Sequence, residues 1–150
     1  MAQKKIKISP EYSAQPSVAK PNSLLEIAIQ YILNKNLVRS KLLKIADYGC
    51  GRLRHFHIFL KYFDVIYLVD TEFQLSRLIK LFGKKTTIKQ YIANIKTSKK
   101  IEVLNNYEFE SSKLNLDIVF SIAVFDVVPP KTRTNMIKSS YENLKKGGFL

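Results

Sequence analysis

Short apolar runs alternate along the chain with longer stretches in which apolar residues recur every three or four positions. The run at residues 65–69 is apolar throughout, which is typical of a strand buried on both faces. The pattern predicts strands at 44–48, 65–69, 101–105 and 116–122, and helices at 23 to about 37, 53–63, 72–82, 88–95 and 130–146. Such an alternation is typical of the α/β class, with a doubly wound parallel sheet and right-handed crossovers.

Local signals predict where several of these helices begin and end. Ser23 and Glu26 have the spacing of a capping box, which predicts Ser23 as the N-cap of the first helix. Gly83 is expected to end the helix at 72–82. Pro129 and Pro130 are expected to open the last helix, which would end at the Gly-Gly pair at 147–148.

The two ends of the chain differ from its middle. Residues 1–22 contain Pro10, Pro16 and Pro21 and show no periodicity, which predicts an extended N-terminal arm before a domain at 23–150. Phe149 and Leu150 begin a further apolar strand, so we expect a domain that is incomplete at its C-terminus. The strand at 116–122 would then form an exposed sheet edge, which predicts self-association through that edge.

Composition and charge narrow the possible classes. A chain of 150 residues is one domain by length, and its single cysteine, Cys50, excludes an internal disulfide and a multi-cysteine zinc site. We find no signal peptide and no apolar stretch long enough to span a bilayer, so we expect a soluble cytoplasmic protein. The formal net charge is +13, carried by scattered lysines. Such a charge attracts nucleic acid at low salt, although scattered lysines can equally serve only to solvate the surface.

Candidate chemistry lies where two predicted strands end. Asp47 and Gly49-Cys50-Gly51 follow the first strand, and Asp70 ends the second. Parallel strands joined by one helix bring both carboxylates to the same edge of the sheet. There, glycines allow a ligand to approach the backbone and an acid can accept the hydroxyls of a ribose. Position 54, where a dinucleotide fingerprint has its third glycine, is Arg54. The acid before the glycines favours a ligand with positive charge and no phosphate.

These motifs resemble those of class I S-adenosylmethionine-dependent methyltransferases, over most of residues 45–150. The run Asp-Tyr-Gly-Cys-Gly at 47–51 looks like their first motif, and Leu-Val-Asp at 68–70 looks like their second. The runs at 117–121 and 124–129 are similar to their fourth strand and the stretch after it. Asn-Leu-Lys-Lys-Gly-Gly at 143–148 resembles the turn before their fifth strand. The resemblance implies a Rossmann-like sheet of strand order 3-2-1-4-5, here without the family's last strands.

The resemblance also implies a cofactor and the residues that would bind it. Asp47 would face the methionine end of S-adenosylmethionine, Asp70 would hold the ribose hydroxyls, and the adenine would lie near the end of the third strand. The implied cofactor-binding residues are Asp47, Gly49, Cys50, Gly51, Asp70, Thr71, Asn105, Asn106, Ser121 and Ile122. The implied activity is methyl transfer to an unidentified acceptor. No residue is identified as catalytic; Asp126, after the fourth strand, is the candidate for contacting the acceptor.

Two other functions stay open at this point. One is a catalytically silent module that binds a nucleotide or nucleic acid through its lysines, and the other is a nicotinamide-dependent oxidoreductase. Amino-methylation of DNA bases is disfavoured, because the run Val-Pro-Pro-Lys at 128–131 lacks both the acid and the aromatic residue of the Asp-Pro-Pro-Tyr motif. His55 and His57 point to different faces of a helix, and no metal site is expected.

Overall fold

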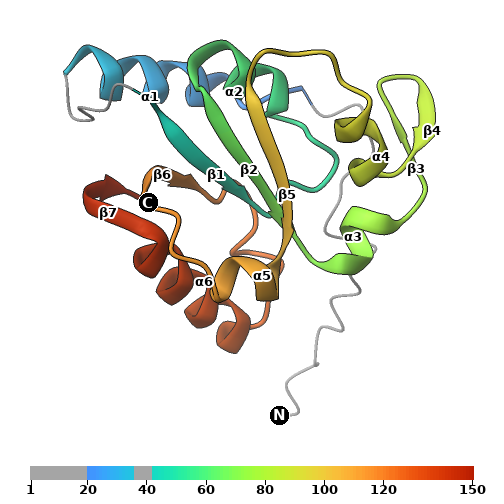
Figure 1. The fold of residues 1–150 in the computed structure, drawn as a ribbon. Helices are drawn as coiled ribbons and strands as arrows, with labels where there is room; N and C mark the ends of the chain where they lie inside the picture. The colour runs from blue at the N-terminus through green and yellow to red at the C-terminus, as the bar shows by residue number, and fades with distance from the viewer. Residues whose placement is uncertain (1–19, 36–41) are drawn as a thin grey trace.

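The computed structural model describes residues 20–35 and 42–150, which form a five-stranded parallel sheet with helices on both faces (Figure 1). The strands are β1 (Lys44–Tyr48), β2 (Val65–Asp70), β5 (Lys100–Asn105), β6 (Leu116–Phe120) and β7 (Leu144–Phe149). Their order in the sheet is β5-β2-β1-β6-β7, with every pairing parallel. This order is 3-2-1-4-5 for the five sheet strands, so the predicted doubly wound α/β fold of Rossmann-like methyltransferase type is confirmed.

Helices cover the two faces because the central strands are apolar on both sides. Nearly every residue of β1, β2 and β6 is buried, as a parallel sheet between two helical layers requires. On one face pack α1 (Ser23–Asn34), α2 (Phe56–Tyr62), α3 (Glu72–Ser76) and α4 (Ile88–Ala93). The opposite face is covered by α5 (Asn106–Glu110) and α6 (Pro130–Asn143).

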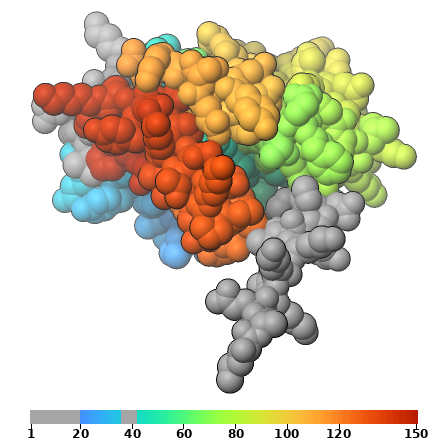
Figure 2. Space-filling model, turned by 90° about the horizontal axis from the view of Figure 1, so that it is seen from below, coloured from blue at the N-terminus to red at the C-terminus, as the bar shows by residue number. Residues whose placement is uncertain are grey.

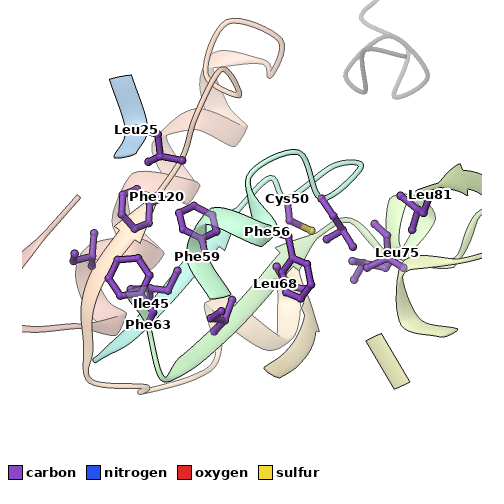
Figure 3. Packing of buried hydrophobic residues seen from close by; sticks show 14 of the residues in the cluster. Leu25, Ile45, Cys50, Phe56, Phe59, Phe63, Leu68, Leu75, Leu81 and Phe120 are labelled. Carbon is purple, nitrogen blue, oxygen red and sulfur yellow. The ribbon is translucent and has the colours of Figure 1, made fainter. Parts of the chain in front are cut away.

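Aromatic side chains fill the layer between the sheet and the first helical face (Figure 3). The ring centroids of Phe59 and Phe120 lie 4.9 Å apart, and those of Phe63 and Phe120 lie 5.9 Å apart. The side chain of Cys50 belongs to the same cluster. Burying such rings stabilises the fold by about 2 kcal/mol or more each, so this cluster fixes α2 and the turn before it on the sheet.

The prediction of a helix at 72–82 is wrong in its second half. The helix α3 ends at Ser76, and β3 (Ile79–Leu81) then pairs antiparallel with β4 (Lys84–Thr86). Phe82 and Gly83 form the two-residue connection, with φ values of 46° and 87°. Positive φ at both positions is the geometry that tight hairpins require, so Gly83 serves a hairpin turn and not a helix end.

Three helix starts and ends also differ from the prediction. Asn22, not Ser23, is the N-cap of α1, and its side chain accepts a hydrogen bond from Leu24 N at 2.9 Å. Glu26 does not reach back to complete a capping box; its carboxylate instead bonds the side chains of Lys61 and Tyr62. The helix α1 ends at Asn34, and the remainder of its predicted span, from residue 36, lies outside the described residues, as do residues 1–19 of the predicted arm. The helix α2 begins only at Phe56.

The C-terminal part of the sheet is more complete than predicted. Leu144, predicted to be helical, opens β7, which runs beside β6 with an irregular register through Gly147 and Gly148. The strand β6 is therefore covered on this side and is not the exposed edge that the prediction of self-association required. Asp117 closes this corner, because its carboxylate pairs with Lys145 and accepts a hydrogen bond from Lys44 N at 2.8 Å.

Candidate functional site

The turn after β1 lies against the carboxyl end of β2. The amide nitrogens of Gly49 and Cys50 donate to Val69 O at 2.8 and 3.1 Å, and Gly51 N donates to Asp70 Oδ2 at 2.8 Å. Seen from the carboxyl edge of the sheet, the teal segment of this turn is visible between α3, α5 and the residues that follow β6 (Figure 2). The structure thus joins the glycines and the strand-end acid in one hydrogen-bonded unit, as the sequence predicts.

Asp47 is a buried carboxylate that lacks a full set of partners. Its side chain is 2% exposed, and its Oδ2 atom has no hydrogen-bond partner among the described residues. Burial, and to a smaller extent the nearby charge of Asp70, together raise the pKa of Asp47 to about 7. A buried acid of this kind is stabilised by a ligand that brings a positive charge or a hydrogen-bond donor.

Asp70 is held in place by backbone groups on both oxygens. Oδ1 accepts from Thr71 N and Oδ2 accepts from Gly51 N, each at 2.8 Å. Burial raises the pKa of Asp70, while these two hydrogen bonds and the charge of Arg77 oppose the increase. Each carboxylate oxygen keeps a further lone pair, so the group can still accept hydroxyl hydrogens from a ligand. The hydroxyl of Thr71 is itself engaged, since it caps α3 by accepting from Gln74 N.

The two glycines have different surroundings. Both have positive φ, at 87° for Gly49 and 51° for Gly51. A Cβ atom on Gly49 would lie 2.4 Å from a methyl carbon of Val124, so this glycine lets the segment after β6 pack onto the turn. Among the described residues, a Cβ atom on Gly51 would meet only Gly49 O, at 3.8 Å, so this glycine leaves open space. Of these two glycines, only Gly51 therefore leaves room for a ligand on the side where a side chain would project.

The side chains of Cys50, Leu53 and His55, within and just after the turn, are buried in the protein interior. Cys50 is buried, and burial together with the charges of Asp70 and Asp47 raises the pKa of its thiol well above the usual value. Its predicted contact with a cofactor is thus limited to its backbone. Leu53 is fully buried with φ of 60°, which delays the start of α2. His55 is buried at the N-cap of α2, and burial and the charge of Arg54 lower its pKa to about 4.

Asn105 ends β5, directly beside Asp70 in the sheet register, and Asn106 follows it as the first residue of α5. The side chain of Asn105 caps α5: it accepts from Glu108 N at 3.0 Å, and Glu108 Oε2 accepts from Asn105 N at 2.7 Å. Asn106 is the partly buried first residue of α5. The structure therefore brings both residues to the predicted edge, but the side-chain oxygen Oδ1 of Asn105 already accepts the hydrogen bond that caps α5.

Ser121 and Ile122 follow β6, whose last residue, Phe120, lies beside Asp47 in the register. Ser121 Oγ is buried and has no hydrogen-bond partner among the described residues, whereas Ile122 packs on the core cluster. Asp126 is exposed, in a turn closed by a hydrogen bond from Val127 N to Val124 O at 3.0 Å. Two polar atoms without partners, Asp47 Oδ2 and Ser121 Oγ, thus stand at the carboxyl ends of neighbouring strands.

Two features of the site were not predicted from the sequence. The sequence shows Val124 only as part of an apolar stretch, and its contact with Gly49 depends on the three-dimensional course of the segment after β6. Arg54 donates from Nε to Lys20 O at 2.6 Å, which holds the chain before α1 close to the site. The arginine at the third glycine position was the only available signal for this contact. Among the described residues, no group of histidine, cysteine or carboxylate side chains is arranged to hold a metal ion.

Comparison with solved structures supports the fold class. The crystal structure of mycolic acid cyclopropane synthase CmaA1, in its apo form, matches 79% of this chain with a TM-score of 0.51 and 17% sequence identity. The match spans 40% of that synthase's own length. No family model and no curated protein matches the chain. The sheet order and this likeness together define a Rossmann-like methyltransferase fold. No helix among residues 20–35 and 42–150 has the length and apolar character to cross a membrane.

Proposed function

We propose that this chain is the cofactor-binding part of an S-adenosylmethionine-dependent methyltransferase. The observation that carries the proposal is the pair of strand-end acids: Asp47 is buried with a free oxygen, and Asp70 is bonded to the glycine turn. One acid suits a cationic group and the other suits ribose hydroxyls. S-adenosylmethionine carries both groups on one molecule.

The atoms without partners fit the methionine end of that cofactor. Asp47 Oδ2 would accept a hydrogen bond from the α-ammonium group, directly or through water, and Ser121 Oγ would bond the same end from β6. The open side of Gly51 gives the ligand access to the turn. Bound S-adenosylmethionine supplies a methyl group already activated by the sulfonium. The chain's own task is therefore to position the cofactor and acceptor, with exposed Asp126 on the acceptor side.

A nicotinamide cofactor fits these residues less well. Its pyrophosphate needs a helix N-terminus directly after the glycines, but here four residues separate Gly51 from α2, which begins at Phe56. The buried Asp47 would also repel a pyrophosphate. These two observations favour the sulfonium nucleoside.

Calorimetric titration of the whole chain with S-adenosylhomocysteine and, separately, with NAD tests the proposal. We expect heat of binding only with S-adenosylhomocysteine. Asp70→Ala should weaken its affinity at least about tenfold, because charge-assisted hydrogen bonds to the ribose are lost. Glu142→Ala, which removes an exposed acid from α6, should leave the affinity unchanged. Binding of NAD alone, or an unchanged affinity in Asp70→Ala, would refute the assignment.

A further inference from the structure

The hairpin of β3 and β4 concentrates positive charge on one small surface. Lys80 and Lys85 face each other across the two strands, and Lys84 stands at the turn. All three are exposed, and none takes part in an ion pair with another described residue. Like charges directly opposite each other destabilise a hairpin. An anion bound between the two lysines would reduce this repulsion.

A shallow pocket lies at the same place. It has a volume of about 260 Å³ and is lined by Leu78, Ile79, Lys80, Gly83 and Lys85. Two ammonium groups and an apolar floor, with no acid in the lining, suit a ligand that joins an anion to an apolar group. A phosphate attached to a nucleoside has this character.

An aromatic ring stands at the tip of the hairpin. Phe82 is 50% exposed, and its ring packs edge-to-face with His57, with centroids 4.6 Å apart, and against Tyr91, with centroids 5.1 Å apart. A half-exposed ring that is held in place by two neighbouring rings can serve as a platform on which a base stacks. The same support limits how far Phe82 can enter a bilayer, which makes a lipid surface the weaker explanation.

From these contacts we infer that the hairpin binds single-stranded nucleic acid. Lys80, Lys84 and Lys85 contact the phosphates, and one base stacks on Phe82. The surface is separate from the candidate cofactor site, because it uses none of the strand-end acids. The overall charge of +13 draws the strand toward the molecule, and the hairpin gives it a defined place to bind.

Fluorescence anisotropy with a labelled 15-nucleotide single-stranded DNA, at several salt concentrations, tests the inference on the whole chain. The variant Lys80→Gln/Lys84→Gln/Lys85→Gln should bind at least about tenfold more weakly. Its slope of log affinity against log salt should fall in magnitude by about 2, as expected when three phosphate contacts are lost. Phe82→Leu should lose about fivefold or more, and Phe82→Trp should keep the affinity because it keeps a stacking surface.

A matched control separates a local site from the general charge. Lys113→Gln/Lys131→Gln/Lys138→Gln removes the same charge from exposed positions on or beside α6, which lies away from the hairpin (Figure 1). We expect this variant to lose less than threefold. An equal loss in both triple variants would overturn the inference. It would also be overturned if the hairpin variants bound the oligonucleotide normally but lost binding to vesicles containing phosphatidylglycerol. Titration with S-adenosylhomocysteine is a separate measurement, expected to be unchanged in every hairpin variant.

Discussion

Asp47 is the residue whose environment says most about what the chain binds. The carboxyl group lies in a region built for apolar side chains, at the end of a strand that is buried on both faces. A purely structural residue at this position would be satisfied by its neighbours, as Asp117 is at the opposite end of the sheet by Lys145 and Lys44 N. The contrast between these two buried acids supports a ligand for the first and an architectural role for the second.

The raised pKa of Asp47 predicts a specific dependence of stability on pH. Its pKa lies near 7 in the folded chain and near 3.8 in the unfolded chain, so the folded state binds this proton more tightly. The contribution of Asp47 to the free energy of unfolding should therefore be largest below about pH 4, and it should fall as the pH rises to 7. The difference amounts to about 4 kcal/mol at most.

Asp47→Asn removes this titration and should flatten the profile between pH 4 and pH 7. The measurement is urea denaturation of the ligand-free chain at a series of pH values. Glu142→Gln makes the same change of charge at an exposed position and should leave the profile as it is in the parent. A parent profile that rises over this interval would contradict the assigned pKa.

At the scale of elements, the sequence predicted the sheet better than the connections. The strands β1, β2 and β5 were predicted almost to the residue. For β2 the reason is its continuous apolar run, which admits few other structures, whereas β1 and β5 are short segments bounded by turn and helix signals. The helix at 72–82 was mispredicted because Leu75, Leu78, Ile79 and Phe82 have helical spacing. The same residues also allow a short helix followed by a hairpin whose inward positions are Ile79 and Leu81. The choice between the two structures depends on whether the folded chain offers a surface against which Ile79 and Leu81 can be buried.

Two further elements carried too little sequence signal. The strand β7 contains two lysines and two glycines, and it exists because Leu144 and Phe149 pair with β6. The helix α5 is five residues long, and the sequence analysis assigns its capping residue, Asn105, to a cofactor.

At the site, the sequence identified the strand-end acids correctly as neighbours, because parallel topology alone brings them together. It could not show which glycine stays open to a ligand.

Asn143 links three elements and should be a strong contributor to stability. It is fully buried; its Nδ2 donates to Phe109 O at 2.8 Å and to Ser139 O at 3.0 Å, and its Oδ1 accepts from Leu114 N at 3.0 Å. Asn143→Ala removes the side-chain partner of the buried Phe109 O in α5 and of the partly buried Leu114 N, which lies just before β6. We expect a loss of about 2–4 kcal/mol in urea denaturation. Asn135→Ala, at an exposed position of the same helix, should change stability by less than about 0.5 kcal/mol, and a similar loss in both would contradict this role.

For the molecule as a whole, charge is divided between two surfaces. The chain carries a net +13, yet the carboxyl edge of the sheet holds two partly or fully buried acids close together. The acids act at short range in a region of low dielectric constant, where screening by salt is weak, whereas the lysines act through water over about 10 Å. The cationic ligand and the polyanion that we propose would thus occupy different places on the molecule.

The integrity of the sheet edge depends on Gly148, which lets β7 approach β6. A Cβ atom there would lie 2.9 Å from a methyl carbon of Leu144, 3.0 Å from Asp117 O and 3.1 Å from Leu116 O. Gly148→Val should therefore separate β7 from β6, expose an apolar parallel strand, and produce dimers or larger species in sedimentation velocity at high concentration. Gly147→Ala is the matched control. Its φ is 80°, but no atom of residues 20–35 or 42–150 lies within 4 Å of the added Cβ, so it should cost about 1 kcal/mol of strain and leave the sedimentation coefficient unchanged. If Gly148→Val sedimented like the control and the parent, β7 would not be what protects β6 from other chains.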